Sequence, residues 1–192
     1  MRHPAEGDHE GRPYPSAADS VLAVIDFQEK LYPHIANHEA VGATAARLIR
    51  LATILGIPIV LTEQNPRGLG STVPVIREAL PLYEPMAKMA FNCCAADPFV
   101  ARLAGLGRHT LVLTGIETHI CVLQTALDAL QRGYRVHVVA DATGSRTPQN
   151  HELGLAVLRQ AGVIVTSLEI VVYEWLEQAG TDVFRQALPL LK

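Results

Sequence analysis

The sequence is poor in the features that mark secreted, membrane-spanning or nucleic-acid-binding proteins. It has only three cysteines, an odd number, which argues against a disulfide framework and for a reducing, cytoplasmic compartment. No apolar run approaches the ~18 residues of a membrane span, and residues 1–20 lack a signal-peptide core. With 16 basic and 19 acidic side chains the net charge is −3, so we expect no nucleic-acid partner and no membrane partner.

What the sequence does contain is typical of one folded domain. Apolar residues make up 49% and charged residues 18% of the 192 residues, enough to bury a full core. Residues 1–19 differ, because they hold three prolines and show no apolar periodicity. We expect them to form a flexible arm, with packing on a partner subunit as the alternative, and residues 20–192 to form the domain.

Short apolar runs followed by helical patterns recur along this domain. The runs lie at residues 21–25, 57–61, 111–113, 136–139 and 163–165. They are continuous and rich in β-branched residues, as in strands buried on both faces of a parallel sheet. Helical patterns cover residues 41–55, 120–130, 148–161 and 181–189. The alternation predicts an α/β fold, a three-layer α/β/α domain with a doubly wound, mainly parallel, Rossmann-like sheet.

Residues 64–95 do not follow this alternation. Their prolines and glycines favour a loop, a short helix near residues 72–79 and a short extended piece at residues 86–88. Because long irregular segments in compact domains often carry function, we expect part of the functional site here.

Polar residues follow the first four apolar runs, at the strand ends where sites lie in open α/β sheets. Asp26 follows the first run, Thr62–Asn65 the second, and Gly115–Cys121 the third. Asp141–Thr143 follows the fourth, with Ser145 and Arg146 behind it. From its position alone, Asp26 is either a functional carboxylate or a cap for the next turn.

Cys121 is the sharpest single feature. It lies in the first turn of a predicted helix, where unpaired backbone N–H groups and the helix dipole favour a thiolate. The alternative is a small core residue, but Ile120, Leu123 and Leu127 already supply the apolar face of that helix. The adjacent Cys93 and Cys94 point apart, and we interpret them as core residues.

Several segments together resemble the isochorismatase-like, or cysteine hydrolase, superfamily. They are Val24–Gln28, Ala87–Phe91, Gly115–Val122, Asp141–Ala142 and Ser145–Arg146. The resemblance covers roughly residues 20–176. The segments Thr62–Gln64 and Gly68–Gly70 look most like the branch of isochorismatase domain-containing hydrolases.

The resemblance implies a catalytic triad of Asp26, Lys88 and Cys121. Cys121 would be the nucleophile and form a thioester, with its pKa lowered by the Lys88 ammonium. Asp26 would take the thiol proton and later activate water. The resemblance also implies a cis peptide between Ile116 and Glu117, which would aim the backbone N–H groups of Glu117 and Cys121 at the oxyanion.

Two departures from the superfamily narrow the chemistry. Nicotinamidases of the superfamily bind a metal through an Asp and two His after the second strand, but residues 63–67 contain no histidine. We therefore expect no metal and no cofactor. True isochorismatases have no cysteine at the nucleophile position, so Cys121 favours hydrolysis of an amide over that of a vinyl ether.

Candidate substrate contacts come from the same strand ends. They are Phe27, Gln28, Gln64, Asn65, Phe91, Glu117, His119 and Arg146. His119 precedes Cys121 in an H-x-C pattern, which is a weak zinc signal, and we interpret it as a turn residue near the site. Arg146 would either bind a carboxylate in a two-pronged way or pair with Asp141 and fix the loop.

Three functional hypotheses follow. The first is a metal-independent cysteine hydrolase of a small amide or other C–N bond substrate. The second is a catalytically silent interaction protein on the same fold. The third is a thiol-redox-responsive protein with Cys93 or Cys94 as the resolving cysteine. The resemblance further implies a homo-oligomer, a dimer or larger.

Overall fold

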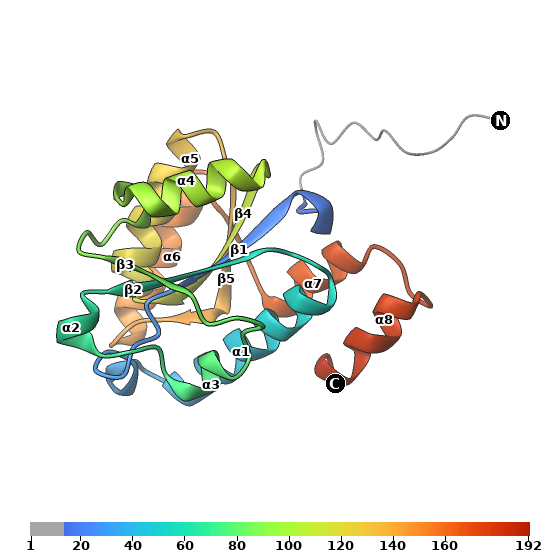
Figure 1. The fold of residues 1–192 in the computed structure, drawn as a ribbon, viewed down its shortest axis with the longest axis horizontal. Helices are drawn as coiled ribbons and strands as arrows, with labels where there is room; N and C mark the ends of the chain where they lie inside the picture. Colours follow the sequence, from blue (N-terminus) through green and yellow to red (C-terminus); the bar gives the residue numbers. More distant parts are fainter. Residues whose placement is uncertain (1–13) are drawn as a thin grey trace.

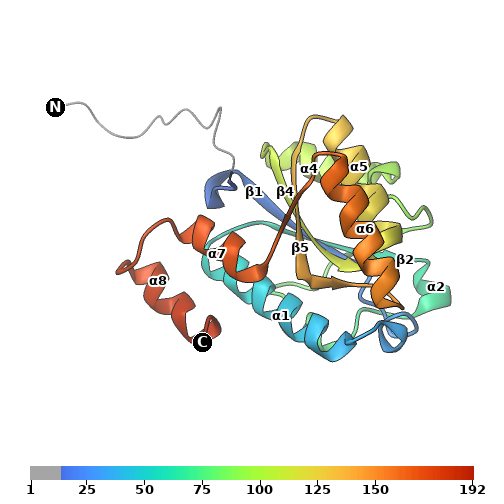
Figure 2. The same cartoon turned by 180° about the vertical axis from the view of Figure 1, so that it is seen from behind.

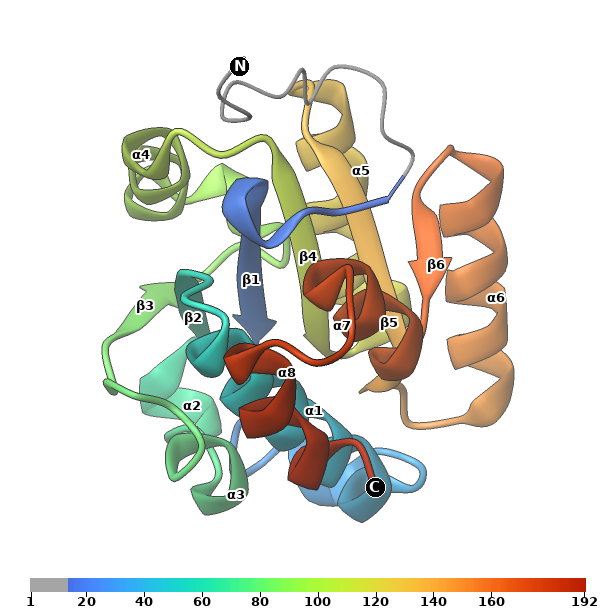
Figure 3. The same cartoon turned by 90° about the vertical axis from the view of Figure 1, so that its right-hand side faces the viewer.

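The computed structural model describes residues 14–192, and residues 1–13 lie outside the described part. It contains a six-stranded, entirely parallel sheet with strand order β3-β2-β1-β4-β5-β6. Figure 3 shows the strands running in one direction between layers of helices, which confirms the predicted three-layer α/β/α fold. The strands are β1 (Ser20–Ile25), β2 (Ile59–Gln64), β3 (Pro85–Lys88), β4 (Thr110–Ile116), β5 (Arg135–Gly144) and β6 (Ile164–Thr166).

The sheet has one strand more than the apolar runs predict. The additional strand is β3, which corresponds to the short extended piece expected at residues 86–88. It pairs in parallel with β2 at the edge of the sheet, where its register places Lys88 beside Gln64. The irregular segment, residues 64–95, therefore contributes an edge strand to the sheet and places Lys88 at its carboxyl edge.

Helices cover both faces of the sheet (Figures 1 and 2). On one face the core includes residues of α1 (His38–Ile54), α3 (Pro74–Arg77), α7 (Leu168–Leu176) and α8 (Asp182–Ala187). On the other face it includes residues of α4 (Asp97–Leu106), α5 (Leu123–Gln131) and α6 (Pro148–Gln160). The four-residue α2 (Pro66–Leu69) lies in the loop after β2. The apolar residues of β1 divide between the two clusters, which is why the strand sequences are continuous rather than alternating.

The segment just before β1 is packed against the domain. Asp19 is buried, and its carboxylate accepts hydrogen bonds from the Thr110 hydroxyl (2.9 Å) and from Arg135 Nη2 (2.6 Å). Arg108 Nη1 donates to the carbonyl oxygen of Ala17 (2.8 Å). The described end of the expected arm, residues 14–19, thus includes a turn fixed to the amino end of the sheet, and the remainder of the arm lies outside the described residues.

Within residues 14–192, no helix has the length and apolar character needed to cross a membrane.

Candidate active site

Asp26 and Lys88 form a buried ion pair at the carboxyl edge of the sheet. Asp26 follows β1 with a positive φ of 55° and is fully buried. Lys88 Nζ donates to its Oδ2 at 2.6 Å, and the Thr62 hydroxyl donates to its Oδ1 at 2.8 Å. The register of β1 and β2 pairs Ile25 with Thr62, which brings this hydroxyl beside the carboxylate. Asp26 is therefore held from two sides.

Lys88 is held by further acceptors. Its Nζ also donates to Gln64 Oε1 (2.9 Å) and to the carbonyl oxygens of Ala90 and Phe91, both at 3.2 Å. Burial alone would lower the pKa of Lys88, but the charge of Asp26 and the hydrogen bond to it raise this pKa above its usual value. Lys88 is thus a fixed cation.

Cys121 lies in a π-helical turn, Thr118–Val122, between β4 and α5. The N–H groups of Ile120 and Val122 both donate to the carbonyl oxygen of Glu117, at 3.1 and 3.3 Å. The N–H of Cys121, which lies between them, does not share this acceptor in the described structure. Single π-turns of this kind are frequent at functional sites.

Cys121 is only 5% exposed, and its thiol lies close enough to Asp26 for the carboxylate to affect its ionisation. Burial, followed by the nearby Asp26 charge, raises the pKa of Cys121, and the attraction of Lys88 does not offset this rise. The expectation of a lowered pKa was therefore wrong, because burial and the carboxylate outweigh the ammonium. The arrangement is a neutral thiol beside a buried carboxylate.

The peptide bond between Ile116 and Glu117 is cis, as predicted. The Glu117 carboxylate accepts hydrogen bonds from the backbone N–H of Arg146 (2.9 Å) and from its Nε, which lies 3.0 Å from Oε1. Asp141 instead accepts from the backbone N–H of Leu168 at 2.8 Å. The suggested Arg146–Asp141 pair is therefore wrong, because the arginine turns to the end of β4 rather than to its own strand.

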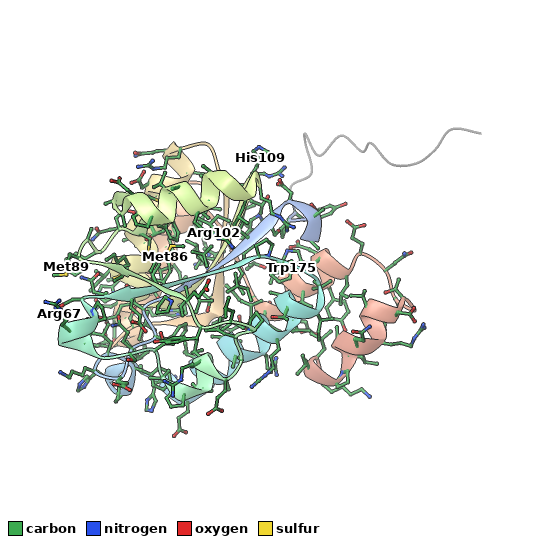
Figure 4. All side chains as sticks on the ribbon, in the orientation of Figure 1. Arg67, Met86, Met89, Arg102, His109 and Trp175 are labelled. Atoms are coloured by element: carbon green, nitrogen blue, oxygen red, sulfur yellow. The ribbon has the colours of Figure 1, made fainter. Side chains whose placement is uncertain are left out.

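The remaining candidates fall into two groups. Phe27 is fully buried in the core, and the Gln28 amide exchanges hydrogen bonds with the backbone of Gln64, accepting from its N–H and donating to its carbonyl oxygen. These side chains are used for packing and loop structure. Phe91, in contrast, is 53% exposed just beyond Lys88, and Asn65 is partly exposed after β2. Figure 4 labels Met89, which follows β3 and lies at the same end of the molecule as Arg67 of α2.

His119 lies beside the cis peptide. Its Nδ1 is 3.0 Å from Ser145 Oγ and 4.0 Å from Glu117 Oε2. The helix α6 packs closely against its backbone, since a Cβ added at Gly154 would meet His119 Cα at 3.0 Å. Gly154 was not identified from the sequence, because a glycine in a helical pattern does not reveal what approaches it.

Cys93 and Cys94 are buried free thiols, with their pKa values raised by burial to about 11 and about 12. Cys93 Sγ lies 3.8 Å from the Thr62 hydroxyl that binds Asp26, whereas Cys94 packs near Thr125. The expected core packing of both residues is consistent with their burial, but Cys93 also borders the Asp26–Lys88 pair.

The loop after β2 offers no cluster of metal ligands. The Glu63 carboxylate already accepts hydrogen bonds from the Thr72 N–H (2.8 Å), the Thr72 hydroxyl (2.8 Å) and the Tyr83 hydroxyl (2.6 Å). Among residues 14–192, no group of three or more His, Cys, Asp or Glu side chains is arranged to hold a metal ion.

A parallel α/β domain that gathers an aspartate, a lysine and a cysteine at the carboxyl edge of its sheet has the architecture of a cysteine-hydrolase-type protein. The isochorismatase domain matches residues 20–170, and the chain belongs to the isochorismatase family. It is 37% identical to isochorismatase domain-containing protein 2A of Mus musculus over 90% of this chain and 82% of that protein.

Solved structures support the same assignment. The MAR1 ribonuclease of Caenorhabditis elegans is 36% identical, with a TM-score of 0.87 over 93% of this chain and 92% of that one. The YcaC gene product of Escherichia coli, described as an octameric hydrolase of unknown specificity, has a TM-score of 0.84 at 23% identity, covering 94% and 88% of the two chains. The latter similarity shows the fold alone.

Proposed function

We propose that this chain is a metal-independent cysteine hydrolase of a small amide or other C–N bond substrate, with Asp26, Lys88 and Cys121 as its triad. The observation that supports this most directly is a buried carboxylate, held by Lys88 at 2.6 Å, whose charge acts on the buried thiol of Cys121. A thiol with a raised pKa is a poor nucleophile by itself, so it needs a neighbouring base to accept its proton before it can attack.

In the first half-reaction, Asp26 accepts the thiol proton as Cys121 Sγ attacks the carbonyl carbon. The carbonyl electrons move to the oxygen, where the N–H groups of Glu117 and Cys121 are the proposed oxyanion donors. When the oxyanion collapses, the C–N bond breaks and the amine leaves with the proton that Asp26 had taken. The product on the enzyme is a thioester, and Asp26 is again a carboxylate.

In the second half-reaction, Asp26 takes a proton from water as the water attacks the thioester carbonyl. Collapse of this second tetrahedral intermediate breaks the C–S bond, and the proton on Asp26 returns to the sulfur. The acid product leaves and the thiol is restored. In both half-reactions, Lys88 holds the Asp26 carboxyl group in place through the 2.6 Å contact of its Nζ.

The proposal includes no metal because of the donors that this chain presents. Residues 63–67 contain no histidine, and the Glu63 carboxylate is already bound by Thr72 and Tyr83. Gln64, Asn65, Phe91, His119, Arg146 and the Glu117 backbone are the proposed substrate contacts. Gln28 and Phe27 support the loop that carries them.

The ribonuclease name of one structural neighbour raises a second substrate class. RNA hydrolysis at this site would be expected to need a basic surface for the phosphate backbone, whereas this chain has a net charge of −3. We therefore place RNA after small amides, and the assay below includes an RNA substrate.

The test compares wild type with Cys121→Ala and Cys94→Ala on a panel of small amides and a single-stranded RNA. We expect Cys121→Ala to lose about 10³-fold or more in amide hydrolysis and Cys94→Ala to stay close to wild type. Mass spectrometry of wild type quenched during turnover should detect an acyl group on Cys121. Unchanged hydrolysis in Cys121→Ala would refute the mechanism, and cleavage of RNA alone would replace the substrate class. Absence of all hydrolysis would favour the silent interaction protein.

We also propose that the chain forms a homo-oligomer in the cytoplasm. The support is limited to the fold it shares with a protein described as octameric and to its three free cysteines. Light scattering coupled to size exclusion gives the mass directly, and a mass of 20.8 kDa would show a monomer.

A further inference from the structure

Arg146 is held in one orientation by a single buried carboxylate. Both its backbone N–H and its Nε contact Glu117, at 2.9 Å to Oε2 and 3.0 Å to Oε1. The Glu117 side chain is 7% exposed, whereas that of Arg146 is 59% exposed. The buried partner therefore fixes the base of the guanidinium group and leaves much of the side chain accessible.

Within the described part of the chain, the outer edge of this guanidinium forms no hydrogen bond or ion pair. In residues 14–192, every hydrogen bond and ion pair of the Arg146 side chain involves Nε, so its two Nη groups donate to no side chain or carbonyl. An arginine presents five N–H donors in a rigid fork, and the pair of Nη groups matches the two oxygens of a carboxylate. A guanidinium already fixed by Glu117 loses little further freedom on binding such a ligand.

The position of Arg146 is at the same edge of the sheet as the triad. In the register of the central strands, Ile25 pairs with Gly115 and Ile116 pairs with Gly144. Asp26 is therefore level with Ile116 and Gly144, one residue before Glu117 and Ser145, and Arg146 follows Ser145 directly. Lys88, the cation of the proposed triad, is occupied by Asp26 and cannot also neutralise a substrate anion.

We propose that the Nη edge of Arg146 binds a carboxylate of the substrate, so that the preferred substrates are small monoamides that carry a second, ionised carboxyl group. This inference rests on the proposed amidase function and specifies its substrate class. The Glu117 carboxylate acts as the positioning group for Arg146. Arg146 itself takes no part in the proton transfers.

A purely structural role of the same pair predicts a different result. If Arg146 only fixes the loop beside the cis peptide, its removal should change kcat for every substrate by the same factor. If it binds a carboxylate, its removal should raise KM for anionic substrates selectively. The distinction requires substrates that differ only in that charge.

The kinetic experiment uses dicarboxylic acid monoamides (malonamate, succinamate and glutaramate) and the corresponding diamides, in which a neutral amide replaces the carboxylate. We expect wild type to prefer at least one monoamide over its diamide by about tenfold or more in kcat/KM. Arg146→Gln should raise KM for that monoamide about 10–100-fold, with a much smaller change for the diamide, and Arg146→Lys should recover part of the loss. Arg159→Gln, at the far end of α6, is the matched control and should behave as wild type.

Equal kcat/KM for monoamides and diamides in wild type, or an equal loss for both in Arg146→Gln, would overturn the inference while leaving the amidase proposal intact.

A binding experiment separates the two proposals if no amide is turned over. Calorimetry with Cys121→Ala should detect binding of the preferred monoamide, or of succinate or glutarate, and the Cys121→Ala/Arg146→Gln double variant should lose it. Binding that depends on Arg146 without any hydrolysis would retain the carboxylate site and remove the amidase function. No binding to Cys121→Ala at about 10 mM ligand would overturn the carboxylate site itself.

Discussion

Strand β1 has a buried aspartate at each end, and the two have different surroundings. Asp19, before the strand, accepts hydrogen bonds from the backbone N–H of His109, the Thr110 hydroxyl and Arg135 Nη2. Asp26, after the strand, is bound by Lys88 and Thr62 and lies beside the thiol of Cys121. In Figure 4, the labelled His109 lies near the start of β1, and the labelled Met89 lies on the opposite side of the molecule.

The difference lies in what the donors can do. The groups around Asp19 hold their protons firmly, so burial alone would raise its pKa but the hydrogen bonds of His109, Thr110 and Arg135 lower it to about 2. Asp26 instead lies beside a thiol, a group that can give up its proton to become a nucleophile. An aspartate therefore stabilises the fold at the amino end of the sheet, whereas an aspartate at the carboxyl end is a candidate general base.

The largest expected effect separates these two roles. Asp26→Asn should lower kcat for amide hydrolysis by about 10²–10⁴-fold, because the thiol loses its proton acceptor. Since this change also leaves the buried Lys88 cation unpaired, it should destabilise the fold by about 3–5 kcal/mol. The double variant Asp26→Asn/Lys88→Met removes both charges and should regain stability without regaining activity, as measured by denaturant unfolding and initial rates.

Asp19→Asn is the matched change at the other end of β1. It should cost about 2 kcal/mol in the free energy of unfolding and leave kcat/KM within about threefold of wild type. Because the folded pKa of Asp19 is depressed from 3.8 to about 2, its contribution is complete above pH 3.8 and is lost only as the pH falls toward 2. If Asp19→Asn reduced activity as strongly as Asp26→Asn, the contrast between the two ends would be invalid.

A further prediction concerns stability at acid pH. The amino half of the sheet contains a second buried titratable group, His137. His137 in β5 is 1% exposed, and burial, assisted by the Arg135 charge, lowers its pKa from 6.5 to about 4. Above pH 6.5 both folded and unfolded chains hold it neutral. Below that value only the unfolded chain takes up the proton, so stability should fall by up to about 3 kcal/mol between pH 6.5 and pH 4.

His137→Leu should remove this part of the pH dependence, because the variant has no group to protonate. The measurement is the free energy of unfolding of both proteins at intervals from pH 7 to pH 4. The difference between the two free energies of unfolding should change between pH 6.5 and pH 4. A difference that is independent of pH would show that His137 takes up no proton on unfolding. Asp19→Asn should not reproduce the change, since Asp19 titrates at lower pH.

Much of this architecture follows from the sequence, and the exceptions have physical reasons. Continuous β-branched runs predicted the central strands correctly because both faces of the sheet are covered. Helix α7 was missed because Ile170, Val171 and Val172 favour strands, and only its cap, Ser167, signalled a helix. Helix α4 was also missed, since it follows an irregular segment directly.

The candidate site shows the same division. The strand ends singled out Asp26 and Cys121, and the family resemblance implied Lys88 and the triad. The structure joins Lys88 to Asp26 and places Cys121 beside them. The hydrogen bonds of the Thr62 hydroxyl and of the Glu117 carboxylate were not predictable, because they depend on the register between neighbouring strands. The pKa direction of Cys121 was predicted wrongly, since burial cannot be read from a motif.

The smallest expected effect tests how sensitive the carboxyl end is to small shifts. A Cβ at Gly154 would lie 3.0 Å from His119 Cα and 3.2 Å from its backbone nitrogen, so Gly154→Ala should displace the turn that carries Cys121. We expect kcat to fall by up to about tenfold, because small displacements of reacting groups are costly. The free energy of unfolding should fall by only about 1 kcal/mol, since the better helix propensity of alanine partly offsets the crowding.

Gly105→Ala in α4 is the control, because a Cβ there meets nothing within 4 Å. It should stabilise the fold by up to about 1 kcal/mol and leave kcat unchanged. Initial rates and denaturant unfolding of the two variants therefore separate a change at the reacting turn from the general effect of alanine in a helix. If Gly154→Ala retained the full kcat, the position of the Cys121 turn would not depend on its contact with α6. The active-site turn at the carboxyl end of the sheet would then tolerate small displacements, contrary to what we expect for a site with reacting groups.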